Sequence, residues 1–234
     1  KPERYDEILD KVDRWYDAIL VHGDQNLIPL EATVPIAAAF QSKIYYTGYV
    51  GERSHAFVSS QGQNEVIVTA GSGRVGLSLL ETAISARPLS TLANNHWRFL
   101  VGSGLSNSQF EALRLKAGHG ITIERHRTDY LSLLRNCAVS LSRAGYNTVM
   151  DILIEKPRAV LVPFETPQET EQLTRARLLA ERGLVQLVEE HRMSPQVLAK
   201  AIDAAYAIEP ASPLNLQVNG AAKSAQILKN LHIP

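Results

Sequence analysis

Residues 137–179 read CAVSLSRAGYNTVMDILIEKPRAVLVPFETPQETEQLTRARLL and carry the densest local signals of the chain. A short apolar run over 138–142 predicts a strand, and a glycine breaks it. We expect a helix next, capped by Asn147 or Thr148, whose side-chain oxygens can accept the free amides of a first turn. Residues 158–162 are β-branched and apolar, which suits a buried parallel strand. The stretch therefore predicts two parallel strands joined by a helix and followed by another helix.

Polar side chains are expected to meet at the carboxyl edge of these two strands. Asp151 lies about one turn inside the first helix, and Glu171 and Gln172 fall at the start of the second. Ligands of open α/β sheets bind at that edge. Carboxylates and amides suit the hydroxyls of a sugar, and a helix N-terminus suits a phosphate. The pattern therefore predicts a site for a sugar joined to a phosphate.

A second glycine-rich loop lies earlier in the chain. Residues 65–69 predict a strand and 77–86 predict a helix, and the sequence AGSGRVG at 70–76 joins them. The spacing G-x-G-x-x-G in this context indicates a phosphate cradle, because glycines let backbone amides approach a diphosphate. The alternative is a glycine-rich turn that serves packing alone.

A dinucleotide-binding enzyme is the main rival from another class. Such enzymes need an acidic residue at the end of the second strand to bind the ribose. The second strand here, 96–101, is followed by Gly102-Ser103-Gly104, and no Asp or Glu stands there. Arg98 lies inside the strand, where it is badly placed to bind a 2′-phosphate. This pattern argues against NAD and NADP.

The order of motifs resembles the carboxyl-terminal domain of glycosyltransferase family 28, of the GT-B type. That family includes the UDP-N-acetylglucosamine transferase of lipid II synthesis. It carries S-R-S/A-G-x-x-T-x-x-E, then V-P-F, then paired glutamines and N-A. This chain has SRAGYNTVMD at 142–151, VPF at 162–164 and EQLTRA at 171–176. The resemblance extends over roughly residues 64–190.

Three positions depart from the family pattern. Asp151 stands in place of the family's Glu, Glu171 in place of the first Gln, and Arg175 in place of the Asn. The last two belong to the part of the motif that recognises the donor sugar. The resemblance therefore leaves the identity of the sugar open.

The resemblance implies a fold and a domain organisation. We expect a Rossmann-like parallel sheet with helices on both faces over residues 58–234, ending in a helix that packs back toward the amino-terminal part. Residues 1–57 would be the end of the amino-terminal, acceptor-binding domain and a linker, with the polar stretch 51–63 at the junction. Most of the acceptor-binding half would then precede Lys1. Such a chain should bind nucleotide but turn over poorly by itself.

The resemblance also implies roles for named residues. Asp151 would bind the ribose, Glu171 and Gln172 the sugar, and His126, following a predicted strand, the base. The diphosphate would lie on two sets of backbone amides and nearby side chains, namely Gly71, Ser72, Gly73, Arg74 and Gly76, and Gly145, Asn147 and Thr148. Arg143 could add positive charge. No general base is identified.

The implied reaction is transfer of a hexosyl group from a nucleotide-diphosphate sugar, most simply a UDP-sugar, to an unknown acceptor that is lipid-linked or a glycan. No metal cofactor is expected.

Two alternative functions stay open. A nucleotide-sugar epimerase of GT-B-like fold would need an acid/base pair facing the sugar, for which Glu169 and Glu171 are the nearby candidates. A non-catalytic nucleotide-binding or scaffold domain would keep the fold alone.

Composition sets outer limits. The 234 residues carry no net charge and the pI is about 7.2, which argues against a general nucleic-acid binder. The single cysteine, Cys137, permits no internal disulfide and fits a reducing compartment. Histidines show no metal-ligand spacing, and no apolar run has the length of a membrane span. We therefore expect a cytoplasmic protein, with peripheral association at a membrane as an open alternative.

Overall fold

The computed structural model describes residues 2–51, 60–71, 76–125, 127–166, 169–208 and 216–231. The chain divides into two compact units. The larger unit is Ser54–Leu214, and the smaller unit joins Lys1–Arg53 to Asn215–Pro234. The interpretation of these parts as a donor domain and the end of an acceptor domain stays a prediction.

The larger unit is built on a six-stranded sheet in the order β5-β4-β3-β6-β7-β8. Every pairing in this sheet is parallel. Within this unit the first strand, β3, lies in the middle of the sheet. The next two strands extend the sheet outward to β5, and β6, β7 and β8 then extend it on the other side of β3. Ligands of such sheets bind at the point where the order reverses, here between β3 and β6. The strands are β3 (Val66–Thr69), β4 (Trp97–Val101), β5 (Ile121–Arg125), β6 (Val139–Ser142), β7 (Ala159–Leu161) and β8 (Gln186–Leu187).

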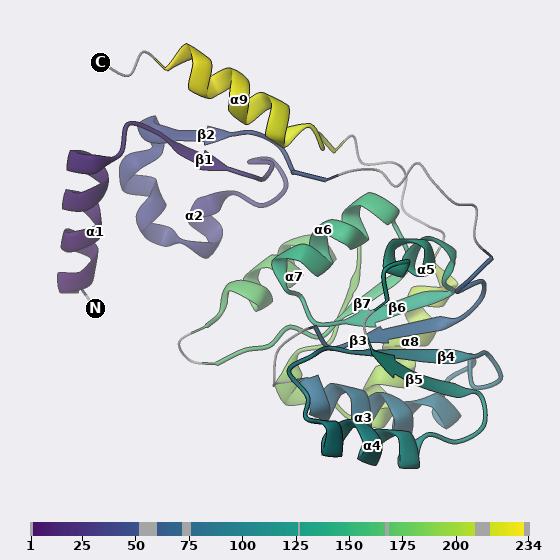
Figure 1. Ribbon diagram of the computed structural model, residues 1–234. Coiled ribbons are helices and arrows are strands. Elements are labelled where there is room, and N and C mark those ends of the chain that lie inside the picture. Colours follow the sequence, from purple (N-terminus) through teal and green to yellow (C-terminus); the bar gives the residue numbers. More distant parts are fainter. Residues whose placement is uncertain are drawn as a thin grey trace. The chain divides into compact units, whose positions relative to one another are not determined.

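Helices cover both faces of this sheet, as Figure 1 shows. One face carries α3 (Leu77–Ala86), α4 (Asn107–Lys116) and α8 (Pro195–Ala207), and the other carries α5 (Tyr130–Asn136), α6 (Tyr146–Glu155) and α7 (Glu171–Glu181). Short 3-10 turns, η3 (Arg87–Leu89) and η4 (Glu190–Arg192), join some of them. The predicted Rossmann-like fold is confirmed.

The strand sequences explain this layering. Successive strand residues point to opposite faces, so a strand covered on both sides must be apolar throughout. In β3, Val66 and Val68 are fully buried in the core that includes α3 and α8. Ile67, between them, is buried against Leu133 of α5 on the other face. The apolar run that predicted this strand thus serves two separate cores.

The smaller unit contains a parallel pair of strands, β1 (Ile19–Val21) and β2 (Ile44–Tyr46). Its other elements are α1 (Pro2–Trp15), α2 (Leu30–Thr33), the 3-10 segment η1 (Pro35–Lys43) and α9 (Gly220–Asn230). The Tyr49 amide donates to the Gln217 carbonyl at 2.7 Å, and the Gly220 amide donates to the Tyr49 carbonyl at 2.9 Å. A Cβ at Gly220 would lie 2.6 Å from the Gly48 carbonyl oxygen, so this close approach requires glycine. The C-terminal helix therefore belongs to the same unit as the amino-terminal segment.

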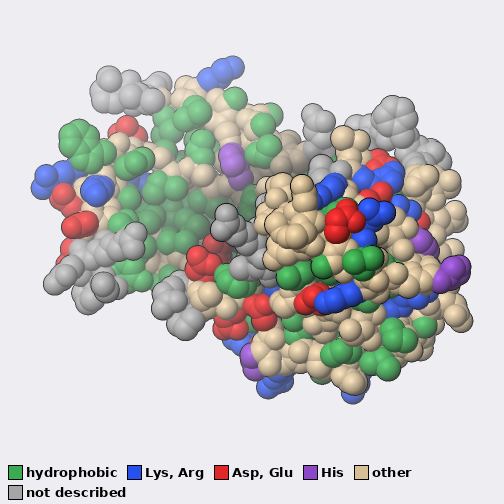
Figure 2. Space-filling model, turned by 60° about the horizontal axis from the view of Figure 1, so that its bottom comes forward, with side chains coloured by type: hydrophobic (Ala, Val, Ile, Leu, Met, Phe, Trp, Pro, Cys, Tyr) green, Lys and Arg blue, Asp and Glu red, His purple; other side chains and the backbone are tan. Residues whose placement is uncertain are grey.

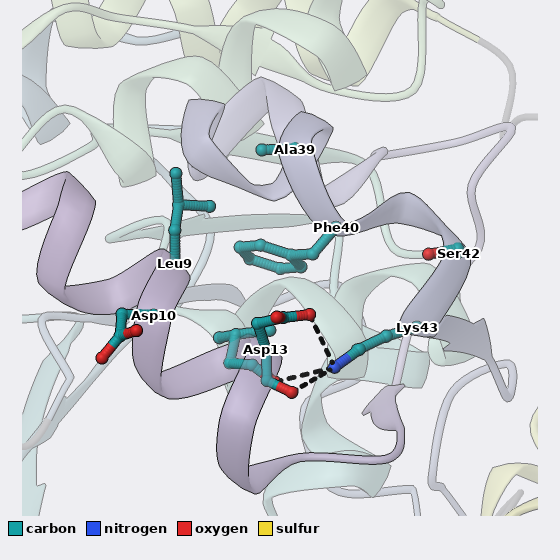
Figure 3. A pocket seen from close by; sticks show the side chains of 8 residues that line it. Leu9, Asp10, Asp13, Ala39, Phe40, Ser42 and Lys43 are labelled. Atoms are coloured by element: carbon teal, nitrogen blue, oxygen red, sulfur yellow. Dashed lines mark hydrogen bonds and ion pairs between the residues drawn. The ribbon is translucent and has the colours of Figure 1, made fainter.

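A lysine joins two elements of the smaller unit (Figure 3). The Lys43 ammonium, at the end of η1, donates to the carbonyls of Val12 and Asp13 at 3.0 and 2.9 Å. Positive charge at a helix C-terminus is favourable, so Lys43 acts as a cap for α1. A cavity of about 410 Å³ lies beside this contact, lined by Leu9, Asp10, Val12, Asp13, Ala39, Phe40, Ser42 and Lys43.

The polar stretch 51–63, predicted as a linker, is described only in part. Residues 52–59 lie outside the described residues. Residues 60–63 form part of the larger unit: the Asn136 side-chain amide donates to the Gln61 carbonyl at 2.9 Å. A Cβ at Gly62 would lie 2.9 Å from the Leu133 Cα. The polar composition of residues 60–63 thus reflects a tight turn packed on α5, and a linker within 51–63 stays a prediction.

The surface agrees with the neutral composition. On the face shown in Figure 2, the larger unit mixes positive and negative side chains, and no single sign of charge dominates it among the described residues. None of the helices in the described parts of the chain is long and apolar enough to cross a membrane.

Candidate functional site

A cavity of about 480 Å³ lies in the larger unit at the carboxyl ends of β3 and β4. This is the sheet edge where the sequence predicted a ligand. Its described lining comes from the end of β3 and the loop after it, the end of β4 and the turn after it, and the helices α5 and α6: Thr69, Gly71, Leu100, Val101, Gly102, Ser103, Tyr130, Thr148 and Asp151. Apolar and polar groups therefore share the wall, as is usual for small-molecule sites.

Asp151 is the carboxylate of this cavity. It lies in the second turn of α6, and burial raises its pKa to about 6, with the negative charge of Glu155 one turn further on adding to the shift. The Glu155 side chain is only 3% exposed and pairs with Arg135 at 2.7 Å. At neutral pH Asp151 is a partly desolvated carboxylate, which accepts hydrogen bonds strongly and donates none.

Tyr130, the first residue of α5, also lines the cavity. Its hydroxyl oxygen is buried and has no hydrogen-bond partner among the described residues. Burial raises the pKa of Tyr130, and the charge of Asp151 raises it further. The Thr69 side chain is near enough to lower this pKa, but it does not meet the phenol in hydrogen-bonding geometry. The phenol is therefore protonated and can donate. The sequence offered no signal for this residue, which reads simply as a helix start.

The N-terminal turn of α6 faces the same cavity through Thr148. The helix begins after Gly145, whose backbone is extended (φ −62°, ψ 151°), and no side chain of the described residues caps it. The expectation that Asn147 or Thr148 would cap the helix is wrong, because both lie inside its first turn. An uncapped first turn directs amide groups and the positive end of the helix dipole outward, which favours an anion.

The earlier glycine-rich loop is described only at its two ends. Gly71 adopts a left-handed conformation (φ 71°) and lines the cavity. Gly76 precedes α3, and a Cβ there would lie 2.3 Å from the Ala70 Cβ, so the close packing of helix on strand requires glycine. Ser72, Gly73 and Arg74 lie outside the described residues.

The sequence of the larger unit matches that of a known protein family. Residues 65–230 match the model of the glycosyltransferase family 28 C-terminal domain. The chain belongs to this family. The family 28 match covers the whole sheet and the cavity described above, and it confirms the resemblance that the motifs indicated.

Curated relatives of this family 28 chain include UDP-N-acetylglucosamine–N-acetylmuramyl-(pentapeptide) pyrophosphoryl-undecaprenol N-acetylglucosamine transferases. The Sulfurihydrogenibium sp. protein is 26% identical over 156 residues, covering 66% of this chain and 42% of its own length. The Burkholderia mallei protein is 31% identical over 90 residues, covering 38% and 24% respectively. The chain thus spans less than half the length of these relatives.

Solved structures show the same fold. MurG of Acinetobacter baumannii aligns with a TM-score of 0.59 and 15% identity over 99% of this chain and 81% of its own. The calicheamicin glycosyltransferase aligns with a TM-score of 0.64 and 15% identity over 97% and 56%. At this level of identity the likeness establishes the GT-B type of fold and nothing about ligands.

The residues expected to bind the sugar lie outside the lining of this cavity. Glu171, at the start of α7, forms an ion pair with Arg175, whose buried guanidinium also donates to the Ala144 carbonyl at 3.1 Å. The Gln172 side-chain oxygen accepts from the Phe164 amide at 3.1 Å, which holds the loop after β7. Two of the three family 28 departures, Glu171 and Arg175, therefore form one pair.

Arg143 has a local role in this family 28 domain. Its side chain is 4% exposed and donates to the Glu190 carboxylate at 2.7 Å and to the Val162 carbonyl at 3.3 Å. Its charge is thus balanced by Glu190.

His126 lies outside the described residues, so its expected contact with the base stays a prediction. In the described parts of the chain, no group of three or more His, Cys, Asp or Glu side chains could hold a metal ion.

Proposed function

We propose that this chain is the donor-binding part of a hexosyltransferase that uses a nucleotide-diphosphate sugar, most simply a UDP-sugar. The observation that carries the proposal is the cavity at the switch edge of the sheet. It combines an uncapped helix N-terminus with a desolvated carboxylate, Asp151, one turn further along the same helix. That pairing suits a phosphate attached to a ribose, and membership of family 28 supports the same ligand.

The two glycine-rich turns are assigned to the diphosphate. One is Gly71–Gly76, and the other is Gly145 with the amides of the first turn of α6. In sugar transfer the bond from the anomeric carbon to the diphosphate breaks, and negative charge grows on the leaving group. Preorganised amides and helix dipoles stabilise that charge without reorganising. They would thereby do what a divalent cation does in other transferases.

The sugar is assigned to the loop and helix start after β7. Glu171 and Gln172 lie there, and the pairing of Glu171 with Arg175 reduces its net charge while leaving carboxylate oxygen available, since the side chain is 57% exposed. An acceptor-only carboxylate suits sugar hydroxyls. The acceptor hydroxyl, lipid-linked or on a glycan, and the group that deprotonates it are not assigned to residues of this chain. A cytoplasmic location is proposed as well, with peripheral association at a membrane as the alternative, because the named relatives act on an undecaprenol-linked acceptor.

Calorimetric titration tests the proposal directly. UDP and UDP-N-acetylglucosamine should bind, and NAD should not. Tighter binding of the UDP-sugar than of UDP would support the assignment of Glu171 and Gln172. Failure of both uridine nucleotides to bind would contradict the proposal and favour a domain that keeps the fold without the ligand. Conversion of a UDP-sugar to its epimer without an acceptor would instead identify an epimerase.

Replacing Gly145 by serine is expected to weaken UDP binding about 10-fold without destabilising the fold. The extended backbone of Gly145 suits a capping serine, whose hydroxyl would accept from the amides that a phosphate needs. No described atom lies within 4 Å of a Cβ at Gly145, so the side chain fits. Titration of UDP and uridine, with thermal melts, measures both effects.

The control for this experiment is Gly118→Ser, which also adds a side chain in open space but in a turn before β5. It should leave UDP binding unchanged. Affinity for uridine should be the same in both variants and the wild type. Equal binding of UDP by Gly145→Ser and the wild type would remove the α6 N-terminus from the diphosphate site.

A further inference from the structure

The hydroxyl of Tyr130 is an unsatisfied polar group in the wall of the cavity. Its oxygen is buried, and the described residues offer it no hydrogen-bond partner. Buried hydroxyls in native proteins are almost always hydrogen-bonded, because an unpaired one costs the free energy of its lost hydration. The exceptions call for an explanation, and a ligand that completes the bond is one. The position of Tyr130 in the lining of the candidate site favours that explanation.

The surroundings of Tyr130 specify the kind of ligand group. Its ring packs beside Ile67 and Leu133, which holds the side chain in place. The other polar residues that line the cavity are Thr69, Ser103, Thr148 and Asp151, and among these described residues Asp151 alone carries a charge. A neutral phenol donates one hydrogen bond, while a carboxylate only accepts. The wall thus presents a donor together with a strong acceptor.

A vicinal diol matches this arrangement. Each of its hydroxyls both donates and accepts, so one diol can give its protons to a carboxylate and accept from a phenol. A phosphate, by contrast, would be repelled by Asp151. A uracil edge could also donate to a carboxylate and accept from a phenol. Asp151, however, lies one turn along α6 from the helix N-terminus assigned to the phosphate, and the ribose is the part joined directly to that phosphate. Of the parts of a nucleotide sugar, the ribose fits the pair best.

We propose that Tyr130 and Asp151 together bind the ribose diol and make the site selective for ribonucleotides over 2′-deoxyribonucleotides. The proposal rests on the proposed function, because it deepens the nucleotide site assigned above. Tyr130 is the added residue. A 2′-deoxyribose would leave the buried donor or the acceptor unpaired, and a site built to bond a hydroxyl rejects analogues without it.

The test compares UDP with 2′-deoxy-UDP by calorimetric titration. The wild type should prefer UDP by roughly 50-fold. Tyr130→Phe keeps the ring and removes the hydroxyl, so UDP should bind about 10-fold more weakly while 2′-deoxy-UDP binds nearly as before. The preference should therefore fall to about 5-fold. Tyr206→Phe is the matched control, because Tyr206 lies on α8 with its ring under Arg158.

Thermal melts separate a binding role from a structural one. Because the Tyr130 hydroxyl makes no hydrogen bond to the described residues, Tyr130→Phe should melt at the same temperature as the wild type or higher. A lower melting temperature together with an unchanged preference for UDP would show a structural hydroxyl and overturn the proposal.

The remaining outcomes are also decisive. If neither nucleotide binds the wild type, the proposed function fails and this inference fails with it. If both bind and Tyr130→Phe weakens them equally, the hydroxyl contacts the base or a phosphate, and the ribose assignment is wrong while the proposed function stands. If the wild type binds both nucleotides equally, the selectivity is refuted in the same way.

Discussion

Replacing Asp151 by asparagine is expected to stabilise the folded protein at pH 8 and to weaken UDP binding at least about 30-fold. The two effects have one cause, since Asp151 is a carboxylate partly removed from water to face a ligand. Burial and the charge of Glu155 raise its pKa from 3.8 to about 6. The charged form is therefore less stable in the folded than in the unfolded chain, and asparagine avoids that cost while keeping the shape.

The sign of the pH dependence follows from the two pKa values. Between about pH 4 and pH 6 the folded protein holds the Asp151 proton more often than the unfolded chain does. Stability from this group therefore falls as the pH rises through that window, and the deficit is complete above it. The advantage of Asp151→Asn should accordingly be full at pH 8 and vanish below about pH 4.

The expected size is modest because Asp151 is only partly buried. After allowance for solvent screening, the gain is about 1 kcal/mol, which corresponds to roughly 2–4 °C in melting temperature. Differential scanning calorimetry at pH 8 and pH 4 measures it. Glu111→Gln, on an exposed ion pair of α4, is a control that should change little. A variant that melts below the wild type at pH 8, or that binds UDP normally, would contradict this account of Asp151.

Replacing Arg98 by methionine is expected to destabilise the fold by about 3 kcal/mol at pH 7. Arg98 lies on β4 with its side chain 12% exposed, and its nitrogens contact Glu65 and Glu124 at 2.6 Å each. Glu65 immediately precedes β3 and Glu124 lies on β5, and both raise the pKa of Arg98, Glu65 most strongly. Without the guanidinium, two poorly solvated negative charges would face each other across the sheet edge.

The measurement is chemical denaturation at several pH values. The loss in Arg98→Met should be largest at neutral pH and shrink in acid, where the two carboxylates become neutral. The triple variant Arg98→Met with Glu65→Gln and Glu124→Gln should recover most of the stability, because no unpaired charge remains. Lys116→Met, which breaks an exposed pair with Glu81, should cost less than about 1 kcal/mol. A pH-independent loss would mean that packing of the arginine stem is responsible.

Arg98, which does not fit a dinucleotide-binding pattern, thus forms ion pairs with Glu65 and Glu124. From the sequence, Arg98 could be judged only as badly placed to bind a 2′-phosphate. The register of β4 between β3 and β5 sets Arg98 beside Ile67 and Thr122, with Glu124 two residues beyond Thr122 on the same face of the sheet. Ion pairing across strands requires that register, which no local pattern encodes.

The sheet and its helices could be predicted from local sequence because parallel strands covered on both faces must be continuously apolar, and glycines and prolines end them. The same logic located the carboxyl edge of the sheet, and with it Gly71, Thr148 and Asp151, which the structure brings to one cavity. The helix cap was predicted wrongly because α6 begins at Tyr146, directly after the extended backbone of Gly145. Gly145 therefore occupies the capping position, and Asn147 and Thr148 lie inside the first turn.

Partners between distant elements came from the folded chain alone. Tyr130 and Asp151 lie on different helices and share a cavity because β3, β4 and β6 lie side by side in the sheet. Glu171 pairs with Arg175, and Gln172 holds Phe164, although the motif suggested sugar contacts for both. The pattern of apolar residues is a property of each segment, so it can be recognised in the sequence of that segment alone. The choice of a polar partner is a competition among all groups within reach, and only packing determines which groups those are.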